Sequence, residues 1–207
     1  MRISKVVYIA LYLFLGMVIL VVSVARAGLE IMAVEDNDHA LRNDPIRFEI
    51  VNSDGEKEEF SYKLPEPGML PTNPFYGFKK IRDYLWIKFS SGNVKRAKVE
   101  LLVADKRMSE AKNLLADNKG KVGLDASQEA FDTLKLAERS ISEVEEKTDE
   151  TKEIHSQIFK AGFAYMAILK ESGESFELDA EKYNQLFKNL DEWNQEQKNK
   201  EEERRYE

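Results

Sequence analysis

The side chains that usually catalyse reactions or bind metal ions are scarce in this sequence. There is no cysteine, which excludes disulfides and thiolate metal sites. The two histidines, His39 and His155, lie far apart along the chain. No Ser/His/Asp arrangement, phosphate-binding glycine loop or His-x-x-x-His pair accompanies them. We therefore predict no catalytic residue, no metal site and no cofactor, and we expect a protein that is not an enzyme.

One acidic stretch has oxygen atoms that attract cations: Glu143, Glu145, Glu146, Asp149 and Glu150. Side chains on a straight helix diverge, so these carboxylates are not expected to converge on a calcium ion. His155 follows at a position that repeats with helical spacing, and we interpret it as a helix-core histidine bonded to a neighbour.

Charge is distributed unevenly along the chain, whose net charge is −7. Between Thr72 and Asn118 there are ten Lys and Arg against five Asp and Glu, whereas between Asp125 and Glu207 there are twelve against twenty-two. These segments predict solvated helices of opposite charge that lie side by side. The alternative is a patch that docks on an anionic membrane or cell-wall polymer, made of Lys79, Lys80, Arg82, Lys95, Arg96 and Lys98. An acidic chain has little long-range attraction for nucleic acid or anionic lipid, and we expect no nucleic acid as a partner.

The first 27 residues have the pattern of a targeting or anchoring segment. Arg2 and Lys5 precede an apolar run from Val6 to Val24, close to the roughly 20 residues that span a bilayer. The small residues Ala25 and Ala27 then occupy the two positions that a signal peptidase reads. A cleaved secretory signal and an uncleaved membrane anchor both remain open.

Both alternatives predict the same location for residues 28–207. Basic residues before an apolar run stay in the cytoplasm, so the rest of the chain is expected outside it. The protein is then extracytoplasmic, either secreted or anchored to the cytoplasmic membrane and facing outward.

Residues 28–63 form an acidic segment with one alternating pattern. Apolar residues alternate with polar ones over Ile46–Val51 and again over Glu59–Leu64, with the turn sequence Asn-Ser-Asp-Gly between them. The pattern predicts a small β-hairpin that lies on the helices, because an isolated hairpin is only marginally stable. A solvated acidic linker is the alternative.

A proline-rich elbow opens the next region, residues 64–125, which we expect to continue as a helical hairpin. Proline fixes φ and lacks an N–H group, so the elbow can be neither helix nor central strand. Asn73-Pro74 then signals a helix start. Phe75, Phe78, Ile81, Leu85 and Phe89 recur at helical spacing, and we predict that they form the buried face, with Tyr76 and Trp86 adding to it.

The elbow resembles the signature of a bacterial extracytoplasmic family of unknown function. The residues that carry the resemblance are Leu64, Pro65, Pro67, Gly68, Leu70, Pro71, Pro74 and Tyr76, followed by Lys79 and Asp83. An Ala-x-x-Arg-x-x-Glu-Ala pattern follows in Ala104, Arg107, Glu110 and Ala111. The resemblance covers Leu64 to Leu115. It implies an extracytoplasmic helical domain, and it carries no known catalytic residue.

Residues 93–117 contain a heptad seam. Its members step by three and four residues and are Val94, Ala97, Leu101, Ala104, Met108, Ala111 and Leu115. Leu102 and Leu114 widen the apolar stripe, which favours an intramolecular bundle. Self-association through such seams is a further expectation.

Residues 126–207 are predicted to form a long helix and a returning C-terminal helix. Helical spacing continues from Ala126 to Glu171, with Asp125 as the expected N-cap. The acidic stretch Glu145–Glu153 has Thr at both seam positions, so a break there is the alternative. A fourth helix is expected to begin near Asp179.

The sequence thus predicts an all-α protein of antiparallel helical hairpins, in a coiled-coil-like bundle behind a proline elbow. Its expected role is an exported or membrane-anchored interaction or structural module. The partners would be the membrane, through an uncleaved N-terminal segment, and an envelope protein or polymer. An extracytoplasmic sensory or regulatory domain that binds a ligand or cation is the alternative.

Overall fold

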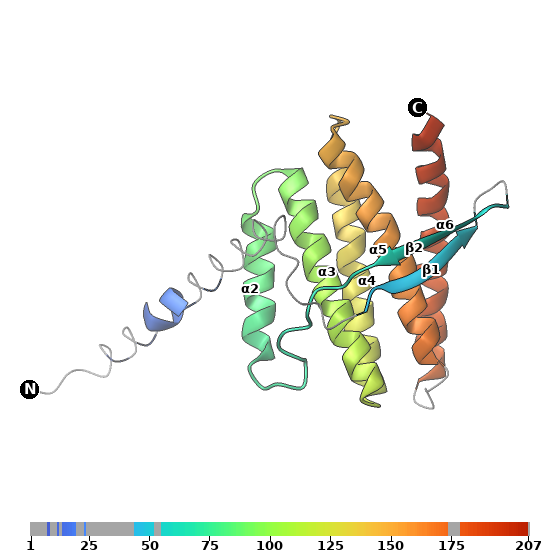
Figure 1. Cartoon of the computed structure of the whole chain (residues 1–207). Helices are drawn as coiled ribbons and strands as arrows, with labels where there is room; N and C mark the ends of the chain where they lie inside the picture. The colour runs from blue at the N-terminus through green and yellow to red at the C-terminus, as the bar shows by residue number, and fades with distance from the viewer. Residues whose placement is uncertain are drawn as a thin grey trace, which may run out of the picture.

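The computed structural model describes residues 44–51, 55–173 and 179–206, with positions 8, 12, 14–19 and 23 of the N-terminal apolar run. The described elements are β1 (Ile46–Val51), β2 (Lys57–Tyr62), α2 (Tyr76–Phe89), α3 (Asn93–Ala116), α4 (Gly120–Ser142), α5 (Asp149–Gly173) and α6 (Ala180–Tyr206). They confirm a helical bundle of antiparallel pairs preceded by a β-hairpin (Figure 1). The expected cleavage residues Ala25 and Ala27, and His39, lie outside the described residues.

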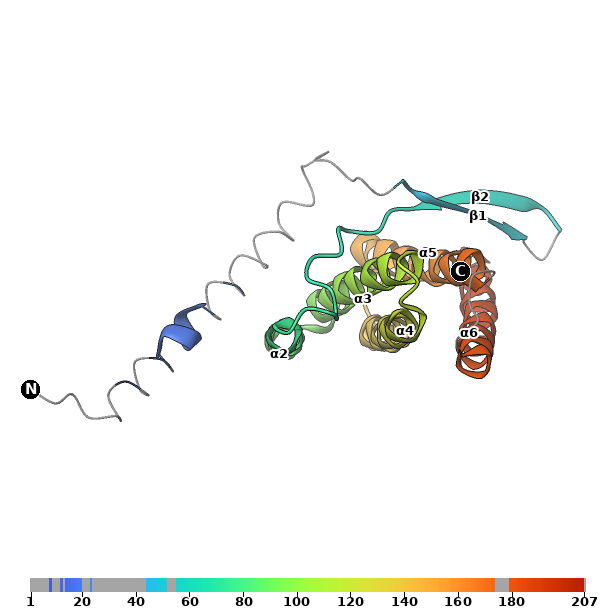
Figure 2. The same ribbon diagram turned by 90° about the horizontal axis from the view of Figure 1, so that it is seen from below.

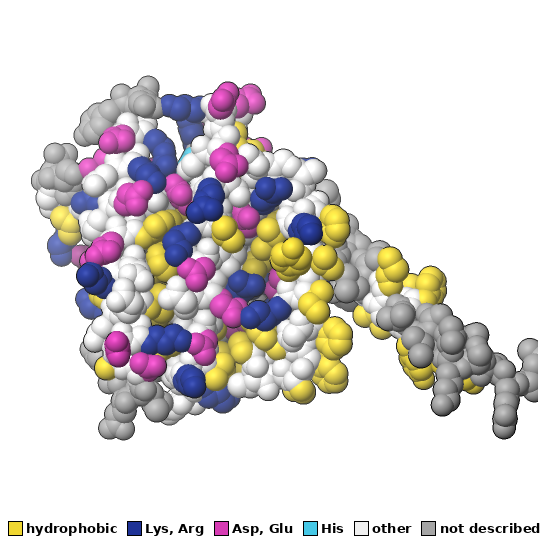
Figure 3. All heavy atoms as spheres, turned by 180° about the vertical axis from the view of Figure 1, so that it is seen from behind, with side chains coloured by type: hydrophobic (Ala, Val, Ile, Leu, Met, Phe, Trp, Pro, Cys, Tyr) yellow, Lys and Arg dark blue, Asp and Glu magenta, His cyan; other side chains and the backbone are white. Residues whose placement is uncertain are grey.

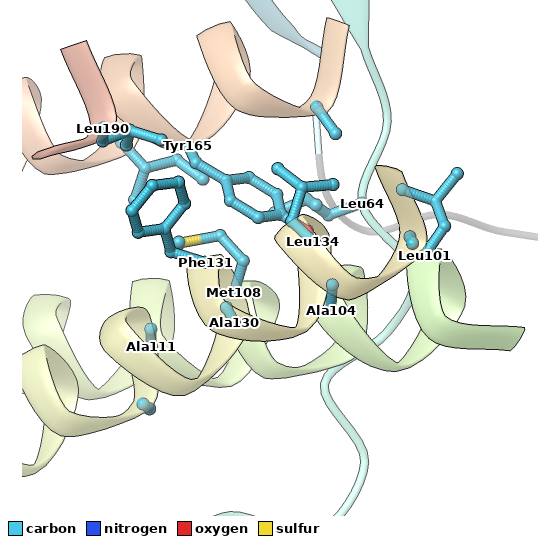
Figure 4. Close-up of a cluster of buried hydrophobic side chains, with 14 of the residues drawn as sticks. Leu64, Leu101, Ala104, Met108, Ala111, Ala130, Phe131, Leu134, Tyr165 and Leu190 are labelled. Atoms are coloured by element: carbon cyan, nitrogen blue, oxygen red, sulfur yellow. The ribbon is translucent and has the colours of Figure 1, made fainter. Parts of the chain in front are cut away.

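The core lies where α3 and α4 pair and α5 crosses them. The predicted seam of α3 is buried from Ala97 to Leu115, and its alanines let α4 approach closely. Met108, Phe131 and Tyr165 meet in the centre of this core, with Leu190 of α6 beside them (Figure 4). The seam therefore packs inside the chain, as the wide apolar stripe predicted.

The turn between α3 and α4 is short, with α3 ending at Ala116 and α4 beginning at Gly120. Asn118 adopts a left-handed φ of 57°, and the Lys119 N–H donates to the Leu114 carbonyl at 2.8 Å, which ends α3. Helix α4 begins at once with Gly120, so the expected cap, Asp125, lies inside the helix. Its carboxylate instead pairs with Lys182 of α6.

The predicted continuous helix over 126–171 is wrong, because residues 143–148 separate α4 from α5. No apolar seam holds this stretch, where Glu145, Glu146 and Lys147 are exposed. The Thr148 hydroxyl accepts a hydrogen bond from the Thr151 N–H at 3.2 Å and caps the new helix. Thr148 and Thr151, whose spacing fitted the heptad seam, therefore mark the start of α5.

The β-hairpin lies across α5 (Figure 2). Its first strand matches the prediction, whereas the second begins two residues earlier than expected and pairs Ile46 with Tyr62. The Phe48 ring stacks between Phe60 and Phe163, with ring centroids 6.0 and 6.2 Å apart. The helix supplies the apolar surface that a two-stranded sheet needs for stability.

Helix α2 turns most of its predicted buried face outward, although Tyr76 and Trp86 pack inward as predicted and Leu85 is half-buried. Phe75, Phe78, Ile81 and Phe89 are 51–74% exposed, while Tyr76, Lys79, Asp83 and Trp86 face α3. Helix α2 begins at Tyr76, and Asn73 caps only the preceding turn by accepting the Phe75 N–H at 2.9 Å. The apolar stripe of α2 is consequently left on the surface.

We expect Gly162→Ala to lower the free energy of unfolding by about 1–3 kcal/mol, the usual cost of overpacking. A Cβ at this position of α5 would meet Asn194 Oδ1 and the Trp193 ring of α6. The helix propensity of Ala opposes the loss by only about 1 kcal/mol. Urea unfolding measures the net effect.

Gly77→Ala is the matched control, because nothing lies within 4 Å of the added Cβ. This variant should be neutral or slightly stabilised. Equal changes in the two variants would contradict a close α5–α6 contact at Gly162.

Candidate functional site

Three polar side chains form a buried cluster between α2 and α3. The Tyr76 hydroxyl donates to Glu110 Oε2 at 2.8 Å, and Lys79 Nζ forms an ion pair with Glu110 Oε1. The ammonium also lies 5.3 Å from the centre of the Tyr76 ring. The Glu110 side chain is 0% exposed and that of Lys79 is 7% exposed, so no substrate reaches this carboxylate.

Burial sets the protonation properties of this cluster. It lowers the pKa of Lys79 to about 8, against the opposing effect of the Asp83 carboxylate. It raises the pKa of Tyr76 to about 12, to which the negative charge of Glu129 adds. The phenol remains a hydrogen-bond donor at neutral pH, and the cluster fastens α2 to α3.

A second carboxylate is enclosed where α3 meets β2 and α5. Asp105 accepts hydrogen bonds from Tyr62 and Tyr165, both at 2.8 Å. Burial raises the pKa of Asp105 to about 7, although both hydrogen bonds favour the charged form. The two tyrosines tie the hairpin and α5 to the same residue, so Asp105 links three elements.

The elbow residues lead from the core to the first cluster. Leu64 is buried in the main core, and Pro65, Pro67 and Pro71 are half-buried, whereas Pro74 is exposed. Gly68 has a φ of 60°, a left-handed conformation that favours glycine. The elbow thus delivers Tyr76 to its acceptor on α3.

The structure does not gather the six basic residues of the predicted docking patch into one free surface. Lys79 is buried, Lys80 pairs with Glu129 at 2.6 Å, and Lys98 pairs with Glu150 at 2.8 Å. Arg82 binds its neighbour Asp83 at 2.8 Å. Lys95 is exposed and Arg96 half-buried at the start of α3.

His155 lies half-buried on α5. Burial and the nearby Arg204 lower its pKa to about 4, so the imidazole is neutral at pH 7. Within the described ranges, no group of three or more His, Asp or Glu side chains is arranged to hold a metal ion.

An open hollow of about 350 Å³ lies between the hairpin and helices α5 and α6, lined by Glu49, Ile50, Val51, Phe163, Gln195 and Lys198.

Among the residues that the structure describes, no helix has the length and apolar character required to cross a membrane. The predicted anchor, residues 1–27, is described only at isolated positions. At residues 14–19 it is helical, and its side chains Phe14, Leu15, Met17, Val18 and Ile19 are exposed.

The fold and its clusters define a helical bundle in which buried charges hold neighbouring elements together. Residues 68–161 of the chain match the model of a family described as a domain of unknown function (DUF5667). This match supports the resemblance to an uncharacterised domain family, and it extends beyond Leu115 into α5. No curated protein and no solved structure gives a significant match to the chain.

The sequence analysis named all three residues of the first cluster but did not predict that they pair. Tyr76, Lys79 and Asp83 are spaced by three and four residues, which places them on one helical face. These residues lie opposite the apolar stripe, and Glu110 in the next helix is an acceptor for them. Together these two features could have indicated the polar contact between α2 and α3. The Asp105 cluster joins three distant segments, and no local spacing indicates it.

Proposed function

We propose that this chain is an exported or membrane-anchored helical module that acts outside the cytoplasmic membrane, by binding rather than by catalysis. The exposed apolar face of α2 carries the proposal. We call it the outer face and define it as Phe78, Ile81, Tyr84, Lys88 and Phe89. Single exposed apolar residues are ordinary, but a row of them on one helix is typical of a binding surface.

The outer face is not needed to complete the bundle. Among the described helices and strands, α2 packs against α3, and its Lys80 also reaches Glu129 of α4. Its inward side already has partners, because Trp86 packs with Val99 and Val103 beside the Glu110 cluster. A surface that the fold leaves uncovered is available to something outside the chain.

The location of the module is proposed from the N-terminal sequence. Arg2 and Lys5 before the run Val6–Val24 favour a cytoplasmic N-terminus, with the bundle beyond the membrane. The exposed apolar side chains at residues 14–19 are consistent with a segment that the bundle does not cover.

The lack of cysteine allows a direct test of location, because one introduced thiol is the only thiol in the chain. Lys121→Cys places it at an exposed position in the first turn of α4. We expect a membrane-impermeant maleimide to label this variant in intact cells as fully as in permeabilised cells. Labelling only after permeabilisation would overturn the proposed location.

Ser4→Cys provides the matched comparison before the apolar run. In an uncleaved anchor this thiol is labelled only after permeabilisation, because it lies on the cytoplasmic side. After signal cleavage it is absent from the mature chain. The mass of the mature protein independently shows whether residues 1–27 have been cleaved.

A further inference from the structure

We propose that the outer face of α2 docks on the surface of an anionic lipid bilayer, with the helix lying in the plane of the interface. This inference deepens the proposed function and depends on membrane association, but not on the side of the membrane. Figure 3 shows hydrophobic side chains gathered along the edge of the molecule that α2 forms, with Lys and Arg among them. Apolar and aromatic residues beside basic ones are the composition of interfacial helices.

The exposed side chains have the size and chemistry that a bilayer interface accepts. Phe78 is 68% exposed, Ile81 51%, Tyr84 59% and Phe89 74%. Met69 in the elbow, 40% exposed, and Phe75, 61% exposed, extend the apolar surface beyond the helix start. Tyrosine and phenylalanine at this density can enter the headgroup region while the rest of the bundle stays in water.

Local charge favours an anionic surface over a second copy of the chain. Residues 67–99 contain seven Lys and Arg and one acid, Asp83, although the whole chain is acidic. Four of these cations have carboxylate partners, whereas Lys88 and Lys95 are exposed and contribute the charge that an anionic surface would meet. Lys88 lies over the Tyr84 ring at 5.6 Å, so a positive charge sits within the outer face itself. Two such faces would repel one another, whereas anionic headgroups attract each lysine near the surface.

The packing of α2 keeps this face outward. Turning α2 to bury its apolar stripe would carry Lys79 and Tyr76 away from Glu110 and leave the buried Glu110 carboxylate without a partner. It would also remove Trp86 from its contact with Val103. The exposed stripe is therefore a stable property of the folded bundle.

The chain before the bundle is long enough to bring the outer face to a membrane. Residues 25–45 connect the apolar run to β1, and twenty-one residues reach at most about 75 Å when extended. A bundle tethered at this length stays close to the bilayer. Docking is then an intramolecular step at high effective concentration.

The test uses the full chain reconstituted in vesicles, with a fluorophore on a single introduced cysteine. Ile81→Cys reports from the centre of the outer face, and Glu192→Cys, exposed on α6, is the matched control. The vesicles contain phosphatidylcholine alone or mixed with phosphatidylglycerol, and a nitroxide on the acyl chains quenches nearby fluorophores. Both labels share the same tether, so the apolar run contributes equally to both readings.

We expect blue-shifted emission and strong quenching at position 81 in the phosphatidylglycerol vesicles only, with little change at position 192. Lys88→Gln and Lys95→Gln should each lower the ratio of docked to undocked protein by about fivefold. Equal quenching at both positions, or no dependence on phosphatidylglycerol, would overturn the inference. A blue shift that follows protein concentration without quenching would assign the face to a second copy instead. If only the maleimide test failed, the location would be wrong while lipid docking would stand.

Discussion

Glu110→Ala is expected to lower the free energy of unfolding by about 3–5 kcal/mol, the range for removing one partner of a buried ion pair. The buried Lys79 ammonium loses its ion-pair partner and keeps only the Met69 carbonyl at 3.5 Å, and the half-buried Tyr76 hydroxyl loses its acceptor. Urea unfolding can be followed by tryptophan fluorescence, because Trp86 lies on the same face of α2. A loss of this size would exceed that of most single substitutions.

Glu129→Ala is the matched control, since its carboxylate pairs with the exposed Lys80. Surface pairs contribute about 0–1 kcal/mol, so this variant should be nearly as stable as the parent. Combining Lys79→Met with Glu110→Ala should recover much of the stability, because no unpaired charge is then buried. A similar loss in the two single variants would contradict the structural role of Glu110.

Asp105→Asn is expected to become more stable relative to the parent protein as the pH rises from 4 to 8. The folded-state pKa of Asp105 is raised to about 7, above its ordinary value, so the folded protein retains a proton that the unfolded chain releases. The contribution of this proton to stability is complete below the unfolded pKa and is lost as the pH rises through 7. A shift of this size corresponds to about 4 kcal/mol as an upper bound.

Unfolding curves of both proteins at several pH values would measure this difference. His155 acts in the opposite direction, because its lowered pKa reduces stability as the pH falls below its ordinary value. Both proteins contain His155, so its effect cancels in the comparison. A difference between the two proteins that stays constant from pH 4 to 8 would show that folding does not raise the pKa of Asp105.

The helical architecture could be predicted because its signals are local and repetitive. The α3 seam keeps one heptad spacing from Val94 to Leu115, and only a helix places these residues on one side. The hairpin has strict alternation around a turn sequence. In both cases apolar periodicity and burial agree.

Helix α2 shows where that reasoning fails. Its periodicity correctly indicated a helix, but the side that faces the core was decided by partners elsewhere in the chain. Tyr76 and Lys79 share the acceptor Glu110 on that side, and Trp86 packs on α3 beside them, while four apolar side chains stay exposed. The break before α5 was missed for a similar reason. The spacing of Thr148 and Thr151 fits a heptad seam, but the same two residues also fit the start of a helix, which is the role they have in the structure.

The hairpin's dependence on α5 has a consequence for the order in which the chain is made. Both strands leave the ribosome long before Phe163, the ring on which Phe48 stacks, and Tyr165, which shares Asp105 with Tyr62. Until then Phe48 and Phe60 have no helix beneath them, and the strands are exposed to wrong pairings. The N-terminal part of the molecule therefore completes its folding late, once α5 has emerged.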